Sequence, residues 1–302
     1  MSRIVIANSK LGIAGALAAW ILVGAVGKVD ASSRLATFDE VQNQLSKPGS
    51  RLLDARSRAE YDKAHAPGAV WVDLNAAEGL AARPDGLTDK AAWESWLAPL
   101  GIEPETEVLV FDGTRQLGAA RIWWLLSYLG VEKVGLIDGN FELWKSQGRP
   151  VTSEIPKVPP RAFPVQIRAD RHASRSDVMD ALKAGQTTIV DARSQAEYAG
   201  ERKLAKRAGH IPGACRLEWS ELVDAEGRFL EESALRGKVE AMKIKPGEPV
   251  ITHCQGGGRS SVDAFAFERL GFPTRNFYLG WSDWGNATET PITEGRDPGG
   301  RP

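Results

Sequence analysis

The chain contains the same pattern twice, and this duplication restricts its fold more than any other feature of the sequence. Residues 52–61 (LLDARSRAEY) return as residues 189–198 (IVDARSQAEY), 137 positions further on. In the same way, residues 64–69 (AHAPGA) return as residues 209–214 (GHIPGA). A unit of this length is too long for one turn of a solenoid repeat. The sequence therefore predicts two related domains in tandem.

A proline-rich stretch separates the two copies. Proline has no N–H to donate and stiffens the backbone, so a stretch rich in it is typical of a semi-extended linker. Residues 150–164 contain five prolines. We therefore expect the first domain over residues 32–149 and the second over residues 165–302, with residues 150–164 as the linker.

Within each copy, short apolar runs alternate with longer helical patterns. Residues 51–53 and 188–190 read as short strands, whereas residues 91–100 and 119–129 have the periodicity of helices. Strands that alternate with helices pair in parallel. The predicted fold class is therefore α/β, with a central parallel sheet flanked by helices in each domain. Ligands of such sheets bind at the carboxyl ends of the strands.

One cysteine stands at such a strand end. Residues 253–261 read HCQGGGRSS, between an apolar run at 249–252 and a helix-like run at 261–270. Consecutive glycines let backbone N–H groups turn inward, and the start of the next helix adds unpaired N–H groups and a positive dipole end. Such a cradle lowers the pKa of a thiol from about 8.5. The candidate nucleophile is therefore Cys254, within an anion-binding loop of Gln255, Gly256, Gly257, Gly258, Arg259 and Ser260. A structural cysteine beside a flexible turn is the alternative.

Composition excludes several other classes of protein. A formal net charge of −1 gives no reason to expect nucleic acid as a partner. Two cysteines, Cys215 and Cys254, are too few for a disulfide framework or a cysteine-based zinc cluster. Four histidines add little to a metal site, so we expect neither a metal nor another cofactor. No feature of the sequence points to a particular oligomeric state.

Residues 1–31 differ from the rest of the chain. Arg3 and Lys10 precede an uncharged stretch at 11–27, and residues 29–31 (VDA) resemble a signal-peptidase site. This layout predicts a secretory signal. The uncharged stretch is 17 residues long, near the lower limit for a membrane-spanning helix, so an uncleaved membrane tether is the alternative. In both cases we expect an exported protein, in the periplasm or anchored to the outer face of the cytoplasmic membrane.

Together these motifs resemble the rhodanese, or thiosulfate sulfurtransferase, family in its tandem two-domain form. The resemblance rests on the Asp-Ala-Arg and Glu-Tyr pairs, the His-Ile-Pro-Gly-Ala turn, the Cys254 loop and the WSDWG run at 281–285, and it covers nearly all of residues 35–292. It implies two similar α/β domains of which only the second is catalytic. Asp112 stands at the cysteine position of the first copy, and a carboxylate cannot carry a transferable sulfur.

The resemblance also implies a double displacement. The Cys254 thiolate attacks the sulfane sulfur of thiosulfate, sulfite leaves, and cyanide or a small thiol takes the sulfur from the persulfide. The N–H groups of the loop would stabilise the anionic sulfur. Arg259 would hold either the sulfonate end of the donor or the loop itself, because a guanidinium donates two bonds at once.

Two positions bear on the donor. Family members that use 3-mercaptopyruvate tend to carry a Cys-Gly-Ser-Gly-Val-Thr loop and an arginine just after the Glu-Tyr pair. Here the loop ends in Arg259, and Ala199 follows the tyrosine. Both features favour thiosulfate. A carboxylate clamp could still come from the basic run after Ala199, which keeps 3-mercaptopyruvate open: Arg202, Lys203, Lys206 and Arg207.

Two other classes of protein are alternatives to a sulfurtransferase: a phosphatase, and a non-catalytic binding or sulfur-relay module. A phosphatase of this fold needs five residues between its cysteine and arginine to encircle a phosphate, whereas four separate Cys254 from Arg259. A non-catalytic binding module has no need of a thiol in an intact glycine loop. A sulfur relay fed by a protein persulfide would keep Cys254 and stays an alternative.

Residues shared by both copies are expected to be structural. Asp191 and Arg193 recur as Asp54 and Arg56 in the first copy, so we expect an ion pair that holds the strand end. A supporting role beside the thiolate is the alternative. His210 recurs as His65 and reads as a turn residue.

The remaining candidates are expected to pack rather than react. His253 precedes the nucleophile on the opposite face of its strand, so it should lie behind the loop. Cys215 reads as a small buried residue. Five tryptophans are expected mostly in the core, the last two also as candidates for a pocket wall: Trp123, Trp124, Trp144, Trp281 and Trp284.

Overall fold

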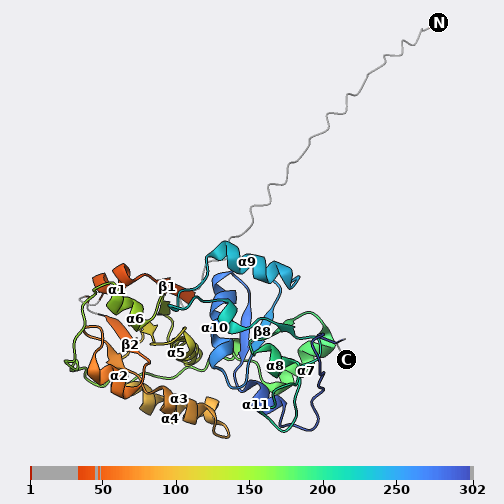
Figure 1. The fold of residues 1–302 in the computed structure, drawn as a ribbon, viewed down its shortest axis with the longest axis horizontal. Coiled ribbons are helices and arrows are strands. Elements are labelled where there is room, and N and C mark those ends of the chain that lie inside the picture. Colours follow the sequence, from red (N-terminus) through yellow and green to blue (C-terminus); the bar gives the residue numbers. More distant parts are fainter. Residues whose placement is uncertain (2–32, 45–46, 48, 300–302) are drawn as a thin grey trace.

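The fold is known from a computed structural model, which describes residues 1, 33–44, 47 and 49–299. The predicted export segment lies outside the described residues apart from Met1. Two lobes lie side by side, the first drawn in orange to yellow and the second in green to blue (Figure 1). Each lobe contains one parallel sheet. The predicted α/β class with two tandem domains is confirmed.

The first domain is built on a five-stranded sheet of order β1-β5-β4-β2-β3. Its strands are β1 (Arg34–Ala36), β2 (Ser50–Asp54), β3 (Val70–Trp71), β4 (Glu107–Phe111) and β5 (Val134–Ile137). Its helices are α1 (Phe38–Gln44), α2 (Arg58–Lys63), α3 (Leu74–Ala81), α4 (Lys90–Leu97), α5 (Leu117–Tyr128) and α6 (Phe141–Ser146). Alternate strand residues face opposite sides: Leu53 packs with α3, α4 and α5, whereas Leu52 packs with α1, α2 and α6.

The second domain repeats this plan with four strands in the order β7-β6-β8-β9. Its strands are β6 (Thr188–Asp191), β7 (Cys215–Arg216), β8 (Val250–His253) and β9 (Thr274–Phe277). Its helices are α7 (Arg175–Ala184), α8 (Gln195–Tyr198), α9 (Glu232–Ala241), α10 (Gly258–Arg269) and α11 (Gly280–Trp284). A single parallel bridge between His172 and Asn276 stands where the first domain has β1.

Strand register shows that the two copies are equivalent at the carboxyl ends of their central strands. Asp54 of β2 pairs with Phe111 of β4, and Asp191 of β6 pairs with His253 of β8. Asp112 and Cys254 are the next residues along the chain. The structure therefore places Asp112 at the cysteine position of the first domain.

Two helices differ from the sequence-based expectation. The helix expected from Ser261 begins at Gly258 instead, because the turn after Cys254 takes only three residues. The helix expected over 91–100 ends at Leu97 and continues as a 3₁₀ turn over Ala98–Leu100. Pro99 has no N–H for the next helical hydrogen bond, which explains the early end.

The two domains share an apolar core. Helices α5 and α10 pack against each other between the lobes (Figure 1). Trp123 meets Phe265 edge to face at 4.9 Å between ring centroids, and Trp124 stacks on Tyr278 at 4.8 Å. All five tryptophans expected in the core are buried. Aromatic contacts of this kind therefore help to hold the two domains together.

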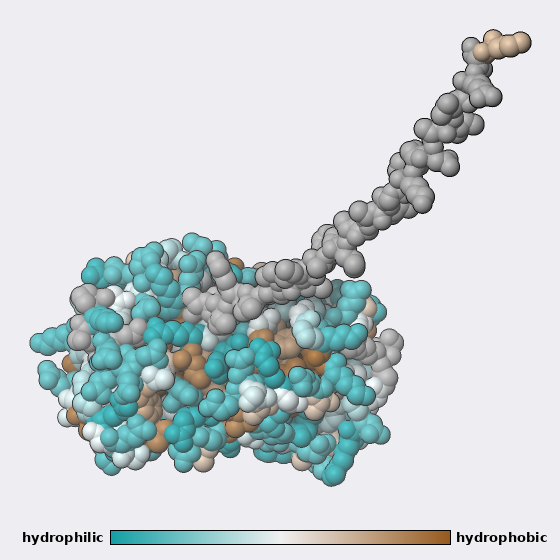
Figure 2. All heavy atoms as spheres, turned by 90° about the horizontal axis from the view of Figure 1, so that it is seen from above, coloured by the Kyte–Doolittle hydropathy of each residue, from teal (hydrophilic) through white to brown (hydrophobic). Residues whose placement is uncertain are grey.

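The face of the molecule drawn in Figure 2 is mainly hydrophilic, with hydrophobic residues in smaller areas between the polar ones. The linker region, residues 150–164, contains neither helix nor strand, and Thr152 forms a bridge with His65 there. Val151 and Ile155 of this segment are exposed. Across the described ranges 33–44 and 49–299, no helix combines the length and apolar character that a membrane crossing requires.

Candidate active site

Cys254 lies directly after β8, where a tight glycine turn leads into α10. Gly257 has a φ of 89°, a left-handed conformation that favours glycine. A Cβ on Gly257 would lie 2.4 Å from the ring of Tyr278, and a Cβ on Gly258 would lie 2.6 Å from Nη2 of Arg121. These two glycines therefore let an aromatic ring and a guanidinium approach the backbone of the loop.

The sulfur of Cys254 is held in a polar environment although the residue is only 2% exposed. The hydroxyl of Ser260 lies 3.4 Å from Sγ. Burial alone would raise the pKa of the thiol. The charge of Arg259, the hydroxyl and N–H of Ser260 and the N–H of Gly256 outweigh burial, so the pKa lies below its ordinary value. The loop thus favours a thiolate, as the glycine pattern predicts.

Arg259 binds a carboxylate of its own domain. Its Nη1 and Nη2 lie 2.6 and 2.8 Å from the two carboxylate oxygens of Glu197 on α8. Burial would raise the pKa of Glu197, but these two hydrogen bonds and the charge of Arg259 lower it to about 2. Arg259 thus links the start of α10 to α8 in the structure.

Asp191 and Arg193 form a buried ion pair with the geometry of its copy in the first domain. The Arg193–Asp191 and Arg56–Asp54 pairs both have an N–O distance of 2.6 Å. Arg193 also donates to the carbonyl of Gly209 and lies over the ring of Trp281. Because the copy beside Asp112 has the same geometry, the pair supports the strand end in both domains.

The histidines near the site contact protein groups rather than the cavity. His210 and His65 stack on Tyr198 and Tyr61 and bond their carbonyls, in matching positions of the two domains. His253 is fully buried in β8, and burial, opposed by nearby Asp191, lowers its pKa to about 4. It is therefore neutral near pH 7 and lies in the sheet behind the loop.

The equivalent loop of the first domain is occupied by its own carboxylate. Oδ2 of Asp112 accepts hydrogen bonds from the N–H groups of Gly118 and Ala119, at 2.8 and 3.1 Å, and from the hydroxyl of Thr114. Oδ1 accepts the N–H of Thr114. The start of α5 thus binds an anion that belongs to the chain.

Other residues of the loop after Asp112 form hydrogen bonds with the second domain. Arg115 donates to the carbonyls of Ser220, Val223 and Asp224. Gln116 donates to the carbonyl of Gly227 at 2.6 Å and to a carbonyl at the end of β5. The first loop therefore contributes to docking of the domains.

A cavity of about 540 Å³ lies between the domains beside Cys254. The sequence does not predict which residues of the first domain line this cavity, because contacts between two domains do not affect the hydrophobic periodicity of either domain. Arg121 is the residue that a signal could have revealed, since it is a lone charge in an apolar helical run. The lining residues are Leu74, Glu78, Ala82, Leu117, Gly118, Arg121, Cys254, Gln255, Gly256, Gly258, Arg259, Tyr278, Leu279 and Ser282.

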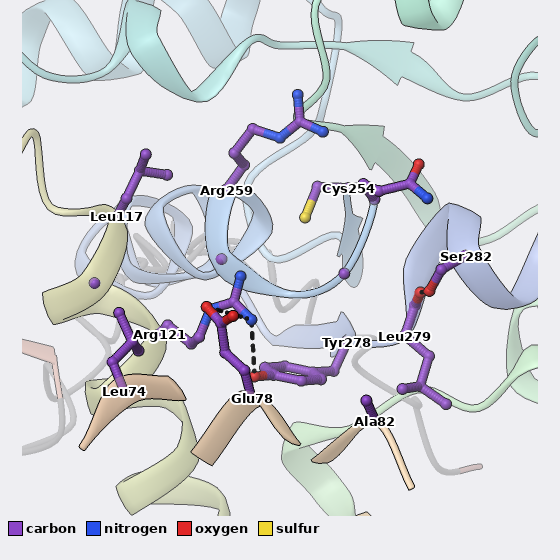
Figure 3. Close-up of a pocket in the computed structure, with 14 residues that line it drawn as sticks. Leu74, Glu78, Ala82, Leu117, Arg121, Cys254, Arg259, Tyr278, Leu279 and Ser282 are labelled. Atoms are coloured by element: carbon purple, nitrogen blue, oxygen red, sulfur yellow. Dashed lines mark hydrogen bonds and ion pairs between the residues drawn. The ribbon is translucent and has the colours of Figure 1, made fainter. Parts of the chain in front are cut away.

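Arg121 carries a charge into this cavity. Its Nη1 lies 3.1 Å from Oε1 of Glu78 and 3.4 Å from the hydroxyl of Tyr278. Burial would lower the pKa of Arg121, but Tyr278, Glu78 and Cys254 raise it above its ordinary value. Figure 3 shows Arg121, Glu78 and Tyr278 together on one side of the Cys254 sulfur, with Arg259 on the other.

One expectation needs correction: Cys215 is half-buried in the edge strand β7 rather than fully buried. Trp281 and Trp284 are buried core residues, as expected. The alternative that they form a wall of the pocket does not hold, because the lining of the cavity includes neither of them.

The basic run does not form the carboxylate clamp that was the alternative to a thiosulfate site. Arg207 donates to the carbonyls of Trp284, Ala287 and Thr290. Within the described part of the chain, the cavity lining includes none of the four candidate clamp residues. The run touches the site through Gln255, whose side chain donates to the carbonyl of Leu204.

Comparisons with known proteins match both halves of the chain. Residues 37–147 and 174–287 each match the model of the Rhodanese-like domain. A thiosulfate sulfurtransferase of Azotobacter vinelandii is 32% identical over 255 residues, which cover 84% of this chain and 94% of the relative. A thiosulfate sulfurtransferase of Pseudomonas aeruginosa is 32% identical over 251 residues, 82% of this chain and 93% of the relative.

A solved structure has the same two-domain architecture. The crystal structure of SseA from Escherichia coli, described among 3-mercaptopyruvate sulfotransferases, matches with a TM-score of 0.70 at 25% identity. The match covers 82% of this chain and 98% of that chain. The tandem arrangement is therefore shared along almost the whole of the solved protein.

Proposed function

The chain belongs to the rhodanese family and is a sulfurtransferase, and we propose that it moves the sulfane sulfur of thiosulfate to a thiophilic acceptor through a persulfide on Cys254. The observation that carries the proposal is the position of Cys254, whose sulfur lies within a loop that lowers its pKa and beside a cavity between the domains. A thiolate, not a thiol, is the form that attacks sulfur.

Both displacements balance in charge and electrons. The thiolate attacks the outer sulfur of thiosulfate, the S–S bond of the donor breaks, and its electron pair leaves with sulfite. The enzyme keeps a persulfide anion. Cyanide or a thiolate then attacks the outer persulfide sulfur, and the Cys254 thiolate returns. The hydroxyl and N–H of Ser260 and the N–H of Gly256 favour negative charge on Sγ.

Three observations support thiosulfate over 3-mercaptopyruvate as the donor. Two relatives at 32% identity are thiosulfate sulfurtransferases. Ala199 stands where a carboxylate-binding arginine would follow the Glu-Tyr pair, and Arg207 of the basic run is bound to backbone carbonyls.

We propose that the first domain transfers no sulfur. Asp112 has no thiol, and its carboxylate already accepts the hydrogen bonds of the loop and of the start of α5. The domain contributes a wall of the cavity instead, through α3 and α5. Asp191 and Arg193 act as supports of the strand end that precedes the reactive loop.

We also propose that residues 1–31 direct export, as a cleaved signal or as a tether through residues 11–27. The charge and apolar pattern of the sequence supports this proposal. Fractionation of the full chain and of a chain without residues 1–31 tests it. The full chain is expected in the periplasm or the membrane fraction, and the shortened chain in the cytoplasm; equal distribution would contradict export.

Thiocyanate formation from thiosulfate and cyanide tests the function. Turnover with thiosulfate that vanishes in Cys254→Ser is the expected result. Measured in parallel, 3-mercaptopyruvate should be the poorer donor. A preference for 3-mercaptopyruvate would overturn the donor, and no turnover of a folded, reduced protein with either donor would favour a relay or binding module.

A further inference from the structure

The geometry points to Arg121 of the first domain, rather than Arg259, as the side chain that binds the anionic end of the sulfur donor. This inference rests on the proposed function and deepens it, because it makes the cysteine-free domain supply the donor-binding charge. Arg121 belongs to α5, whereas the nucleophile belongs to the loop before α10.

Arg259 is already paired with a buried carboxylate, and separating the two would be costly. Both of its terminal nitrogens lie within 2.8 Å of the two oxygens of Glu197. The Glu197 side chain is 2% exposed and accepts a further hydrogen bond from Ser194. Removing Arg259 from this pair to bind a donor would leave a buried carboxylate without its cation, which is costly.

Arg121 has a weaker set of partners. Its contacts run through Nη1, to Glu78 at 3.1 Å and to the hydroxyl of Tyr278 at 3.4 Å. The Glu78 side chain is 41% exposed, so water competes for it. Nε and Nη2 lie against Gly258, in the reactive loop itself, where any larger residue would collide with them.

The chemistry of the donor fits a guanidinium at this place. Thiosulfate presents a sulfonate whose oxygens match the two-pronged donation of an arginine. During the first displacement the electron pair of the donor S–S bond leaves with sulfite, so negative charge grows at the group that Arg121 would hold. Arg121 therefore binds the donor and also stabilises the leaving group, while Glu78 occupies Arg121 in the resting site.

Three variants separate this role from a structural one. Arg121→Gln removes the charge, Arg121→Lys keeps the charge but loses the fork, and Glu78→Gln releases Arg121 from its carboxylate. We expect the KM for thiosulfate to rise about tenfold to a hundredfold in Arg121→Gln. The rise should be smaller in Arg121→Lys, and the KM should fall up to about fivefold in Glu78→Gln.

Binding without turnover gives a readout independent of catalysis. Calorimetry measures thiosulfate binding to Cys254→Ser and to Cys254→Ser combined with each of the three changes. The expected order of affinity is Glu78→Gln, then unchanged site, then Arg121→Lys, then Arg121→Gln. Glu78→Gln also removes a negative charge from the cavity wall that would repel the donor, so its tighter binding supports the inference only together with the loss of affinity in Arg121→Gln.

Alkylation of Cys254 gives a second readout. Iodoacetate is anionic and iodoacetamide is neutral, so the ratio of their rates reports on positive charge near the thiolate while the thiolate fraction cancels. We expect the ratio to fall about tenfold in Arg121→Gln and to rise in Glu78→Gln. Circular dichroism checks that each variant is folded. If Arg121→Gln does not fold, the comparison is made with Arg121→Lys instead.

The outcomes distinguish this inference from the function on which it rests. An unchanged affinity and rate ratio in both Arg121 variants, with thiosulfate turnover intact, would overturn the role of Arg121 and leave the sulfurtransferase proposal standing. Loss of affinity in Arg121→Gln supports the inference even when the cyanide assay shows no turnover. Equal loss in Glu78→Gln and Arg121→Gln would assign both residues to domain docking and overturn it.

Discussion

After β4 and after β8 the chain makes related turns with different residues, and the two turns bind different things. Asp112 and Cys254 begin them at equivalent strand ends. The N–H of Ala119 at the start of α5 bonds the Asp112 carboxylate, and the N–H of Ser260 in α10 bonds the Cys254 sulfur. In the first domain the cradle is filled by the chain itself, whereas in the second it stabilises a reactive anion.

The lengths of the two turns fit these roles. Helix α5 begins five residues after Asp112, and α10 begins four residues after Cys254. The longer first turn has room for Arg115 and Gln116, which reach carbonyls of the second domain. One duplicated turn thus supports docking while the other supports chemistry, so a domain without a nucleophile still contributes to the site.

Substitution of the first residue of each turn should separate the two domains most clearly, because only the change at Cys254 should abolish turnover. Cys254→Ser should lower thiosulfate turnover at least about a thousandfold, because the hydroxyl is not ionised at neutral pH. Asp112→Asn should keep turnover within about threefold but lower the free energy of unfolding by about 1–3 kcal/mol, since it replaces a hydrogen-bonded carboxylate. Cyanide assays and urea titrations measure both. A loss of turnover in a folded Asp112→Asn protein would break the division of roles.

Alanine substitutions at the glycines of the Cys254 turn should have the second-largest effect on activity. Gly257→Ala meets the Tyr278 ring at a positive φ, and Gly258→Ala meets Arg121. Each should lower kcat/KM by about tenfold to a hundredfold, because small displacements of reacting groups are costly. Gly256→Ala is the matched control, since nothing lies within 4 Å of its added Cβ, and it should change kcat/KM by no more than about twofold. Equal effects of all three alanines would contradict the packing account.

Loss of docking by the first turn should appear in the free energy of unfolding rather than in turnover. Arg115→Ala removes hydrogen bonds to three carbonyls of the second domain and should lower the free energy of unfolding by about 2–3 kcal/mol. Arg236→Ala removes an exposed arginine that pairs with Glu232 within α9 and should cost about 0.5 kcal/mol or less. Denaturant titration compares them, and similar costs would remove the docking role of Arg115.

The smallest expected effect concerns pH. His253 takes the strand position that Phe111 has in the first domain, and its pKa is lowered to about 4 from 6.5. Between these values the unfolded chain binds more protons than the folded one, so stability falls as the pH decreases. His253→Phe should reduce this fall between pH 7 and pH 5 by on the order of 2 kcal/mol. Identical pH slopes of both proteins, measured by urea titration, would contradict a buried neutral His253.

The features that occur in both copies of the repeat could be predicted from the sequence. The matched motifs at 52–61 and 189–198 predict two domains, and alternation of strands and helices predicts parallel sheets. The glycine run predicts a tight turn around Cys254, and the structure has it. The recurrence of Asp54 and Arg56 in the second copy correctly indicates a structural ion pair.

Contacts between distant segments could not be read from the sequence. Arg259 pairs with Glu197, 62 residues earlier, because α8 and the loop meet at the same sheet edge. Arg121 and Glu78 reach the cavity because α5 packs on α10. The positions of Arg121 and Glu78 depend on how the two domains dock, and no local pattern in the sequence records that geometry.

Mass spectrometry after incubation with thiosulfate would detect the proposed persulfide itself. We expect that one sulfur atom is added, that it maps to the peptide with Cys254, and that cyanide removes it. The peptide with Cys215 should stay unmodified, and Cys254→Ser should gain nothing. Turnover with the added sulfur on Cys215, or with no covalent sulfur on the protein at any stage, would contradict the account.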